Sequence, residues 1–152
     1  MIAASSPVRI GVIGVGNMGS GHVNWLLEGK VKGAVCAAIC DRETDKLAGD
    51  LIKRLQQISP ETRIEKVVVS EAGASKALIR SGLVDAVIIA TPHFDHTTIG
   101  IDALEQGLHV MVEKPLSVHK SDCEKMIAAY KKRPQKSQLF AAMFNQRTDP
   151  KY

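Results

Sequence analysis

Aromatic residues make up only 4% of this 152-residue chain, and its lysines and arginines are scattered without any long basic run. Both features argue against a nucleic-acid surface, which stacks bases on aromatic rings and gathers basic side chains on one face. No apolar run approaches the roughly 18 residues that a membrane span needs, and the start of the chain lacks the pattern of a signal peptide. We therefore expect no nucleic-acid partner, no membrane partner and a cytoplasmic location.

Cysteine is also scarce. The three cysteines, Cys36, Cys40 and Cys123, include no C-x-x-C pair, so neither a disulfide framework nor a cysteine-based metal site is expected. Cys36 and Cys40 lie in one apolar run, where we expect them to act as small core residues in a reducing compartment.

The residues that are abundant indicate one globular domain. Hydrophobic residues make up 45% of the chain and charged residues 24%, with a net charge of +4, which is typical of a packed core rather than of disorder. Short apolar runs alternate with segments of helical periodicity. The expected strands are Val8–Ile13, Val35–Cys40, Lys66–Val69, Val84–Ala90, His109–Val112 and Leu139–Phe144. The expected helices are Asn17–Glu28, Glu43–Gln57, Ala72–Arg80, His96–Gln106 and Ser121–Lys132.

The expected strands are apolar throughout rather than alternating, which indicates strands covered on both faces. Strands that alternate with helices join through right-handed crossovers, and the result is an α/β fold with a parallel sheet. The pattern predicts a doubly wound, six-stranded Rossmann sheet. In such a sheet ligands bind beyond the carboxyl ends of the strands, so the residues that follow each strand are the candidates for function.

A glycine-rich turn follows the first expected strand, with the spacing Gly14-x-Gly16-x-x-Gly19. Gly14 would permit a tight turn, Gly16 a close approach of the backbone to a pyrophosphate, and Gly19 close packing of the helix on the strand. The free N–H groups of the helix start, including those of Asn17 and Met18, would then bind the phosphates.

The second expected strand leads into Asp41, about 20 residues beyond the last glycine, where dinucleotide-binding folds carry an acid for the ribose hydroxyls. A carboxylate there favours NAD over NADP because it repels a 2′-phosphate. Arg42 keeps NADP open, since a guanidinium can meet that phosphate or stack on adenine.

The fourth expected strand ends in Ala90, and the residues Thr91, Pro92, His93 and His96 follow it. We expect this turn to lie along the dinucleotide, with His96 either contacting the ligand or only starting the next helix. A His-x-x-His pair can bind metal. No further group of potential ligands accompanies these two histidines, so no metal site is expected.

The fifth expected strand ends in Glu113-Lys114-Pro115. The fold would place Lys114 at the crevice beside a nicotinamide, where its amine could accept a substrate proton or orient a substrate oxygen. The alternative is an ordinary exposed loop lysine. Pro115 stiffens the turn and is a candidate for a cis peptide bond.

Taken together, GVGNMG, the Asp41-Arg42 strand end, DAVIIATPHFDH, GLHVMVEKP and MFNQRTDP resemble the N-terminal half of the Gfo/Idh/MocA oxidoreductases. The resemblance implies hydride transfer between NAD(P) and a hydroxyl carbon of a sugar, cyclic polyol or related compound, with Lys114 as the catalytic residue. It places Glu113 and Asn145 with the cofactor-binding residues. Members of the family continue into a C-terminal α+β sheet domain that forms most of the substrate pocket and the oligomer interface.

We expect no part of that second domain within these 152 residues. We expect residues 1–145 to be the dinucleotide-binding domain, and residues 146–152 to begin the connection to the missing one. Alone, the chain should bind the dinucleotide but be poorly active, whereas the full-length form should be a homo-oligomer. Two other hypotheses stay open, a non-catalytic dinucleotide-binding or sensing module and a methyl-donor site. The glycine spacing and Lys114 favour the dehydrogenase.

Overall fold

The structure is a computed structural model, and it describes residues 6–42, 53, 66–69 and 73–145. The described strands are β1 (Val8–Ile13), β2 (Ala34–Asp41), β3 (Lys66–Val69), β4 (Ala86–Ile89), β5 (His109–Val112) and β6 (Phe140–Ala142). The described helices are α1 (Asn17–Leu27), α3 (Ala74–Ile79), the 3₁₀ turn η1 (His93–Asp95), α4 (His96–Glu105) and α5 (Lys120–Lys131). The helix expected at 43–57 falls outside the described residues except for Lys53.

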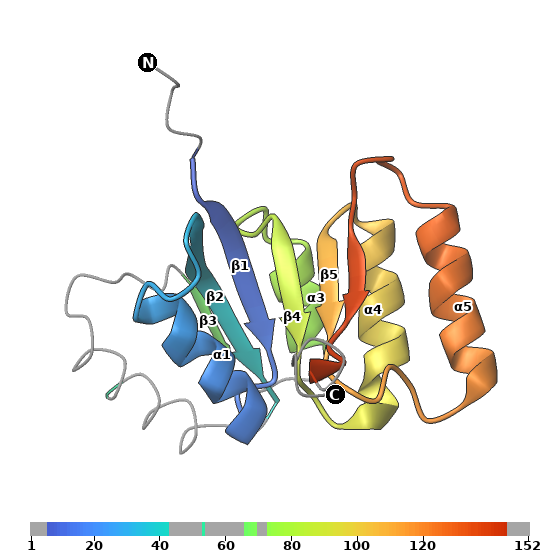
Figure 1. Cartoon of the computed structure of the whole chain (residues 1–152), viewed down its shortest axis with the longest axis horizontal. Helices are drawn as coiled ribbons and strands as arrows, with labels where there is room; N and C mark the ends of the chain where they lie inside the picture. The colour runs from blue at the N-terminus through green and yellow to red at the C-terminus, as the bar shows by residue number, and fades with distance from the viewer. Residues whose placement is uncertain (1–5, 43–52, 54–65, 70–72, 146–152) are drawn as a thin grey trace.

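The strands form one six-stranded sheet in the order β3-β2-β1-β4-β5-β6 (Figure 1). Every neighbouring pair is parallel, which confirms the predicted doubly wound Rossmann sheet. The strand order changes direction between β1 and β4, because β2 lies on one side of β1 and β4 on the other. The loops at that switch point diverge and leave a crevice beyond the carboxyl ends of the two strands.

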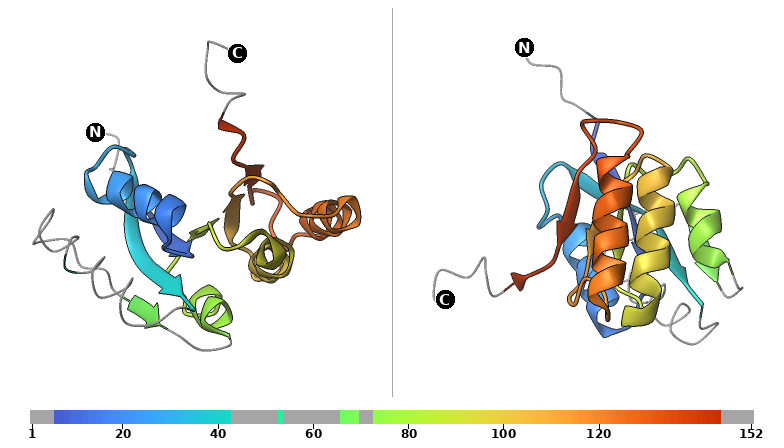
Figure 2. Two further views of the ribbon diagram at one scale, coloured as in Figure 1. Left: turned by 90° about the horizontal axis from the view of Figure 1, so that it is seen from below. Right: turned by 90° about the vertical axis from the view of Figure 1, so that its right-hand side faces the viewer.

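The helices lie in two layers. Helix α1 covers one face of the sheet, while α3, α4 and α5 cover the other (Figure 2). This division follows from right-handed crossovers, which run in opposite directions on the two sides of β1. A smaller core cluster around Val12, Val23 and Ile39 lies beneath α1. A larger one, around Ile89, Leu104 and Met126, lies beneath α4 and α5.

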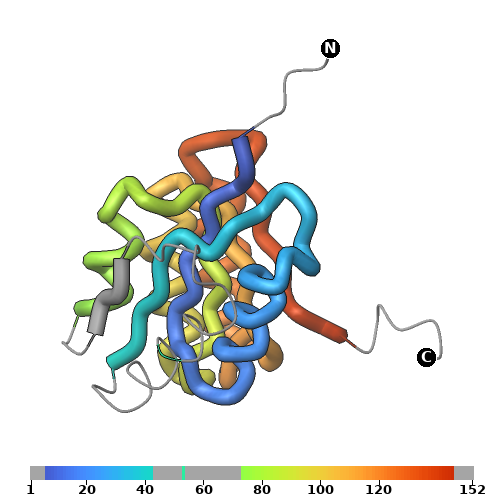
Figure 3. Tube along the Cα trace, turned by 90° about the vertical axis from the view of Figure 1, so that its left-hand side faces the viewer, coloured from blue at the N-terminus to red at the C-terminus, as the bar shows by residue number. Residues whose placement is uncertain are grey.

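Residues 143–145, which follow β6, lie on the α1 side of the sheet (Figure 3). Cys36 and Cys40 of β2 are buried in the core, as the sequence predicted. Burial raises the pKa of each of these thiols to about 12. Among the described residues, no helix is both long and apolar enough to cross a membrane.

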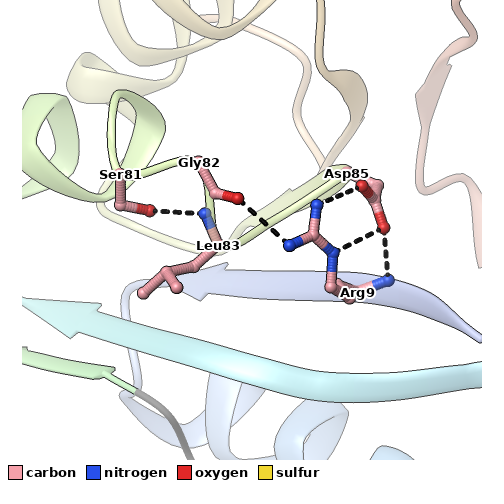
Figure 4. Close-up of polar contacts among 5 residues, drawn as sticks. All are labelled: Arg9, Ser81, Gly82, Leu83 and Asp85. Carbon is pink, nitrogen blue, oxygen red and sulfur yellow. Dashed lines mark hydrogen bonds and ion pairs between the residues drawn. The ribbon is translucent and has the colours of Figure 1, made fainter.

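Strands β4 and β6 are shorter than predicted. The ladder of β4 begins at Ala86, because the carboxylate of Asp85, rather than a backbone carbonyl, accepts the N–H of Arg9 at 2.9 Å. The same carboxylate binds the Arg9 guanidinium at 2.7 Å, and a second guanidinium N–H donates to Gly82 O (Figure 4). These hydrogen bonds to Arg9 lower the pKa of Asp85. Within the described part of the chain, strand β6 pairs with Val110–Val112 of β5 over three residues.

Candidate functional site

A cavity of about 640 Å³ opens at the carboxyl ends of β1, β2 and β4, where the fold predicts a ligand. Most of the residues selected from the sequence line it. They are Gly14, Gly16, Asn17, Met18, Asp41, Arg42, Ala90, Thr91 and Pro92.

The glycine turn between β1 and α1 is built for close approach. Gly14 has φ +86°, and a Cβ there would lie 2.8 Å from the backbone of Ala90 and Thr91. A Cβ on Gly19 would lie 1.7 Å from Gly14 O, so Gly19 serves helix packing. Gly19 is buried and lies outside the cavity lining. Its contact with a coenzyme stays a prediction.

Gly16 behaves differently from the other two glycines. A Cβ there would meet nothing within 4 Å, so the backbone is open on that side. Gly16 is also the N-cap residue of α1, and no side chain caps the helix. The first N–H groups of any helix have no intrahelical acceptor, and in α1 no side chain caps them. They are therefore suited to bind a phosphate.

Asp41 ends β2 at the edge of the same turn. Its Oδ2 accepts the N–H of Val15 at 2.8 Å, which ties the strand end to the glycine turn. Next to it, Arg42 forms an exposed ion pair with Asp95 of η1, with 3.4 Å between Nη1 and Oδ2. Both partners of that pair line the cavity.

Thr91 follows β4 and offers an unused polar atom. Its Oγ1 is buried and has no hydrogen-bond partner among the described residues. A buried hydroxyl without a partner costs free energy, and a polar ligand in the cavity that Thr91 lines could supply one.

Several lining residues were not selected from the sequence. They are Ile13, Cys40, Gly73, Ala74, Ser75, Asp95, Thr98 and Ile99. Most of them come from the first turns of α3 and α4 or the residues just before. Because every helix of this fold that follows a strand begins at the carboxyl edge, these first turns could have been included on topology alone.

Glu113 is 5% exposed, and its Oε1 lies 2.7 Å from Nε2 of His22 in α1. Its Oε2 accepts the backbone N–H of Lys114 at 3.2 Å. With both oxygens engaged, Glu113 supports the turn from inside, and it does not line the cavity. The resemblance had suggested Glu113 as a cofactor-binding residue, and no motif in the sequence indicated its pairing with His22.

Lys114 is exposed at the carboxyl end of β5. The peptide bond between Lys114 and Pro115 is cis, as the sequence suggested it could be. Lys114 is not a lining residue of the cavity, but its strand lies directly beside β4, and Glu113 N donates to Ile89 O at 2.9 Å. It therefore sits one strand away from Ala90 and Thr91.

His96 starts α4, as expected, but it is 0% exposed. Its Nδ1 lies 2.9 Å from Pro115 O and its Nε2 lies 2.9 Å from Thr91 O. The ring has no exposed surface, and contact of His96 with a coenzyme stays a prediction. His93 and Asn145 are exposed and also lie outside the cavity lining. The described residues contain no group of three potential metal ligands.

Comparison with known proteins identifies the family. The sequence profile of the Gfo/Idh/MocA oxidoreductases, described as having an NAD-binding Rossmann fold, matches residues 8–140. This chain belongs to that family. The glycine turn with its open Gly16, the strand-end Asp41 and the unpartnered Thr91 hydroxyl fit an NAD dinucleotide.

Individual relatives are consistent with this assignment. Inositol 2-dehydrogenase 1 of Saccharopolyspora erythraea is 32% identical over 95% of this chain and 39% of its own length. An alpha-N-acetylgalactosaminidase of Shewanella oneidensis is 33% identical over 79% of this chain and 25% of its own length. The crystal structure of scyllo-inositol dehydrogenase from Lactobacillus casei, with bound NAD(H) and scyllo-inositol, shares the fold at a TM-score of 0.73. That protein is 22% identical, and the likeness covers 95% of this chain and 38% of that one. This chain thus spans well under half the length of each of these relatives.

Proposed function

We propose that this chain is the coenzyme-binding part of an NAD(P)-dependent dehydrogenase that oxidises a hydroxyl carbon of a sugar or cyclic polyol. One observation carries the proposal. An exposed lysine ends β5, one strand away from a cavity whose glycine turn is open to phosphates. The inositol dehydrogenases among the relatives support a polyol substrate.

Different residues serve coenzyme binding and proton transfer. The open backbone at Gly16 and the first N–H groups of α1 bind the pyrophosphate, and Asp41 accepts hydrogen bonds from the ribose hydroxyls. A nicotinamide coenzyme bound in this cavity would supply the acceptor for a hydride from the substrate carbon. The amine of Lys114 would take the hydroxyl proton and become an ammonium, so that the C–H and O–H bonds of the substrate break and a C=O double bond forms.

The first experiment is a calorimetric titration of this chain with NAD⁺, NADP⁺ and S-adenosylmethionine. We expect NAD⁺ to bind, and S-adenosylmethionine to produce no heat of binding. Absence of binding by either nicotinamide dinucleotide would reject the proposal.

The second experiment tests Lys114 in a protein that carries the relatives' remaining length. Lys114→Ala should lower polyol-dependent NADH formation by about 10²–10⁴-fold, the usual contribution of a general acid or base. Its affinity for NAD⁺ should stay within about threefold of wild type, because the side chain does not line the cavity. Turnover close to wild type would reject the catalytic role.

Glycoside cleavage is a second candidate, because the Shewanella alpha-N-acetylgalactosaminidase is as similar in sequence as the inositol dehydrogenase. A chromogenic N-acetylgalactosaminide distinguishes the two. Release of the chromophore without net NADH formation would favour hydrolysis, and polyol-dependent NADH would favour the dehydrogenase.

Three broader statements stay predictions. Residues 1–145 would form the dinucleotide-binding domain, and residues 146–152, outside the described part, would begin the connection to a substrate domain. We also retain a homo-oligomer in full-length form and a cytoplasmic location.

A further inference from the structure

His96 is a polar side chain with no exposed surface in the first turn of α4. Burying an imidazole costs free energy unless its nitrogens find partners. Each ring nitrogen of His96 lies 2.9 Å from a backbone carbonyl oxygen, which is within hydrogen-bonding distance. A neutral ring carries one N–H and satisfies one carbonyl, whereas a doubly protonated ring donates to both. Polar contact with these two oxygens, rather than apolar packing, therefore explains a histidine at this position.

The two carbonyls belong to the two turns that flank the carboxyl edge at β4 and β5. One is that of Thr91, which lines the cavity. The other is that of Pro115, which directly follows Lys114. The strands before them are paired in parallel, with Ile89 opposite Val112, so the two turns leave the sheet side by side. His96 is thus a physical link between the coenzyme cavity and the lysine turn.

A second contact from the same helical turn holds the lysine turn. Thr97 Oγ1 lies 2.8 Å from Ser117 Oγ, so the first turn of α4 fixes the segment after Lys114 at two points. On the other side, Glu113 accepts the N–H of Lys114. The backbone of Lys114 is therefore held before and after the residue, while its side chain stays exposed.

We propose that His96 is a positioning residue that holds the backbone of the Lys114 turn in register with the coenzyme cavity, by bridging the carbonyls of Pro115 and Thr91. The inference rests on the function proposed above for Lys114. It assigns His96 no contact with coenzyme or substrate.

Two conservative variants each remove one of the two contacts that His96 makes with Pro115 O and Thr91 O. In H96Q the amide nitrogen takes the place of Nε2, so the contact with Thr91 O is kept and that with Pro115 O is lost. In H96N the amide nitrogen takes the place of Nδ1, and the opposite bond is kept. Both variants retain one polar contact, which favours folding of the variant proteins.

Gln138 offers a matched control, because its amide nitrogen also bridges two buried carbonyls. It lies 2.9 Å from Leu104 O and 2.6 Å from Leu108 O, and the residue is 1% exposed. Leu108 precedes β5, at the end of the sheet opposite the cavity. Q138L should lower the melting temperature without affecting the lysine turn or the cavity.

The readouts are amide hydrogen exchange by NMR and the NAD⁺ dissociation constant by calorimetry, both on this chain. In H96Q we expect exchange of the Lys114 amide to rise about tenfold, the equilibrium factor of one lost hydrogen bond, relative to amides of β1. In H96N we expect the NAD⁺ dissociation constant to rise by about the same factor, with Lys114 exchange near that of wild type. Q138L should reproduce neither change.

Unchanged exchange of Lys114 in H96Q, or equal changes in H96Q and Q138L, would overturn the inference and leave His96 as an ordinary core residue. Unchanged NAD⁺ affinity in H96N would overturn the link to the cavity. If wild type binds no dinucleotide, the proposed function fails separately, and the exchange comparison still decides whether His96 holds the lysine turn.

Discussion

Two glycines in the same helix should respond in opposite ways to the same substitution. Gly19 and Gly21 both lie in α1, two residues apart. A Cβ on Gly19 would lie 1.7 Å from Gly14 O and 2.8 Å from Gly14 C, both backbone atoms that cannot rotate away. A Cβ on Gly21 would meet nothing within 4 Å. The comparison therefore isolates close packing of the glycine turn from helix propensity.

The structure sets the expected magnitudes. Replacing glycine by alanine inside a helix stabilises the fold by about 0.5–1 kcal/mol, so Gly21→Ala should raise the free energy of unfolding by about that amount. In Gly19→Ala the new Cβ would lie 1.7 Å from Gly14 O. Helix α1 would have to shift until that distance is about twice as long, which is an ordinary contact between nonbonded atoms. Overpacking costs about 1–3 kcal/mol and sometimes more, and this rigid contact lies at the upper end. For Gly19→Ala we expect the free energy of unfolding to fall by about 2–3 kcal/mol, which corresponds to a fall in melting temperature of about 4–12 °C.

Urea unfolding followed by far-UV circular dichroism measures both variants, and calorimetry measures their NAD⁺ affinity. Gly19→Ala should also weaken NAD⁺ binding, because the displaced turn no longer presents Gly16 to the phosphates. Gly21→Ala should bind as wild type does. If Gly19→Ala is as stable as Gly21→Ala, the close approach of α1 to the turn is wrong, and with it the account of the cavity.

Three further predictions concern other parts of the molecule. His22→Leu leaves the buried Glu113 side chain without its hydrogen-bond partner, and it should lower the free energy of unfolding by about 1–3 kcal/mol, the usual cost of an unsatisfied buried polar group. A loss below about 1 kcal/mol in urea unfolding would contradict a tightly held contact. Because Arg9 lowers the pKa of Asp85 in the folded state, their pairing stabilises the fold above the unfolded pKa of about 4 and is lost as the pH falls through the lower folded value. Wild type should therefore be more stable than Asp85→Asn at neutral pH, by about 1 kcal/mol or less because the pair is half-exposed. This difference should shrink on acidification, and a difference that grows instead would contradict a lowered pKa of Asp85. With a thiol reagent at mildly alkaline pH, Cys123 should react first and the two buried cysteines of β2 only on unfolding, and rapid modification of all three would refute their burial.

The sequence by itself determined the class of fold and the succession of the described strands along the chain. Apolar runs of strand length alternating with helical periodicity are local patterns, and the connection rules leave few ways to assemble them. The glycine turn and Asp41 could be assigned for the same reason, since their spacing along the chain reflects one strand–turn–helix unit and the strand after it. Lys114 and Thr91 followed from the rule that function lies after the strands.

The tertiary structure decided how those residues are held. The partner of Glu113 is His22, 91 residues away along the chain, and no local period connects the two. From the sequence, His96 suited a ligand contact and a helix start equally well. Only the tertiary structure showed that its buried ring lies 2.9 Å from the carbonyl oxygens of Thr91 and Pro115, 5 and 19 residues away along the chain. Strand and helix patterns arise from neighbours along the chain and so can be read from it. Buried polar pairing depends on which side chains the packed layers bring within hydrogen-bonding distance, and that is settled only when the whole sheet and its helices are assembled.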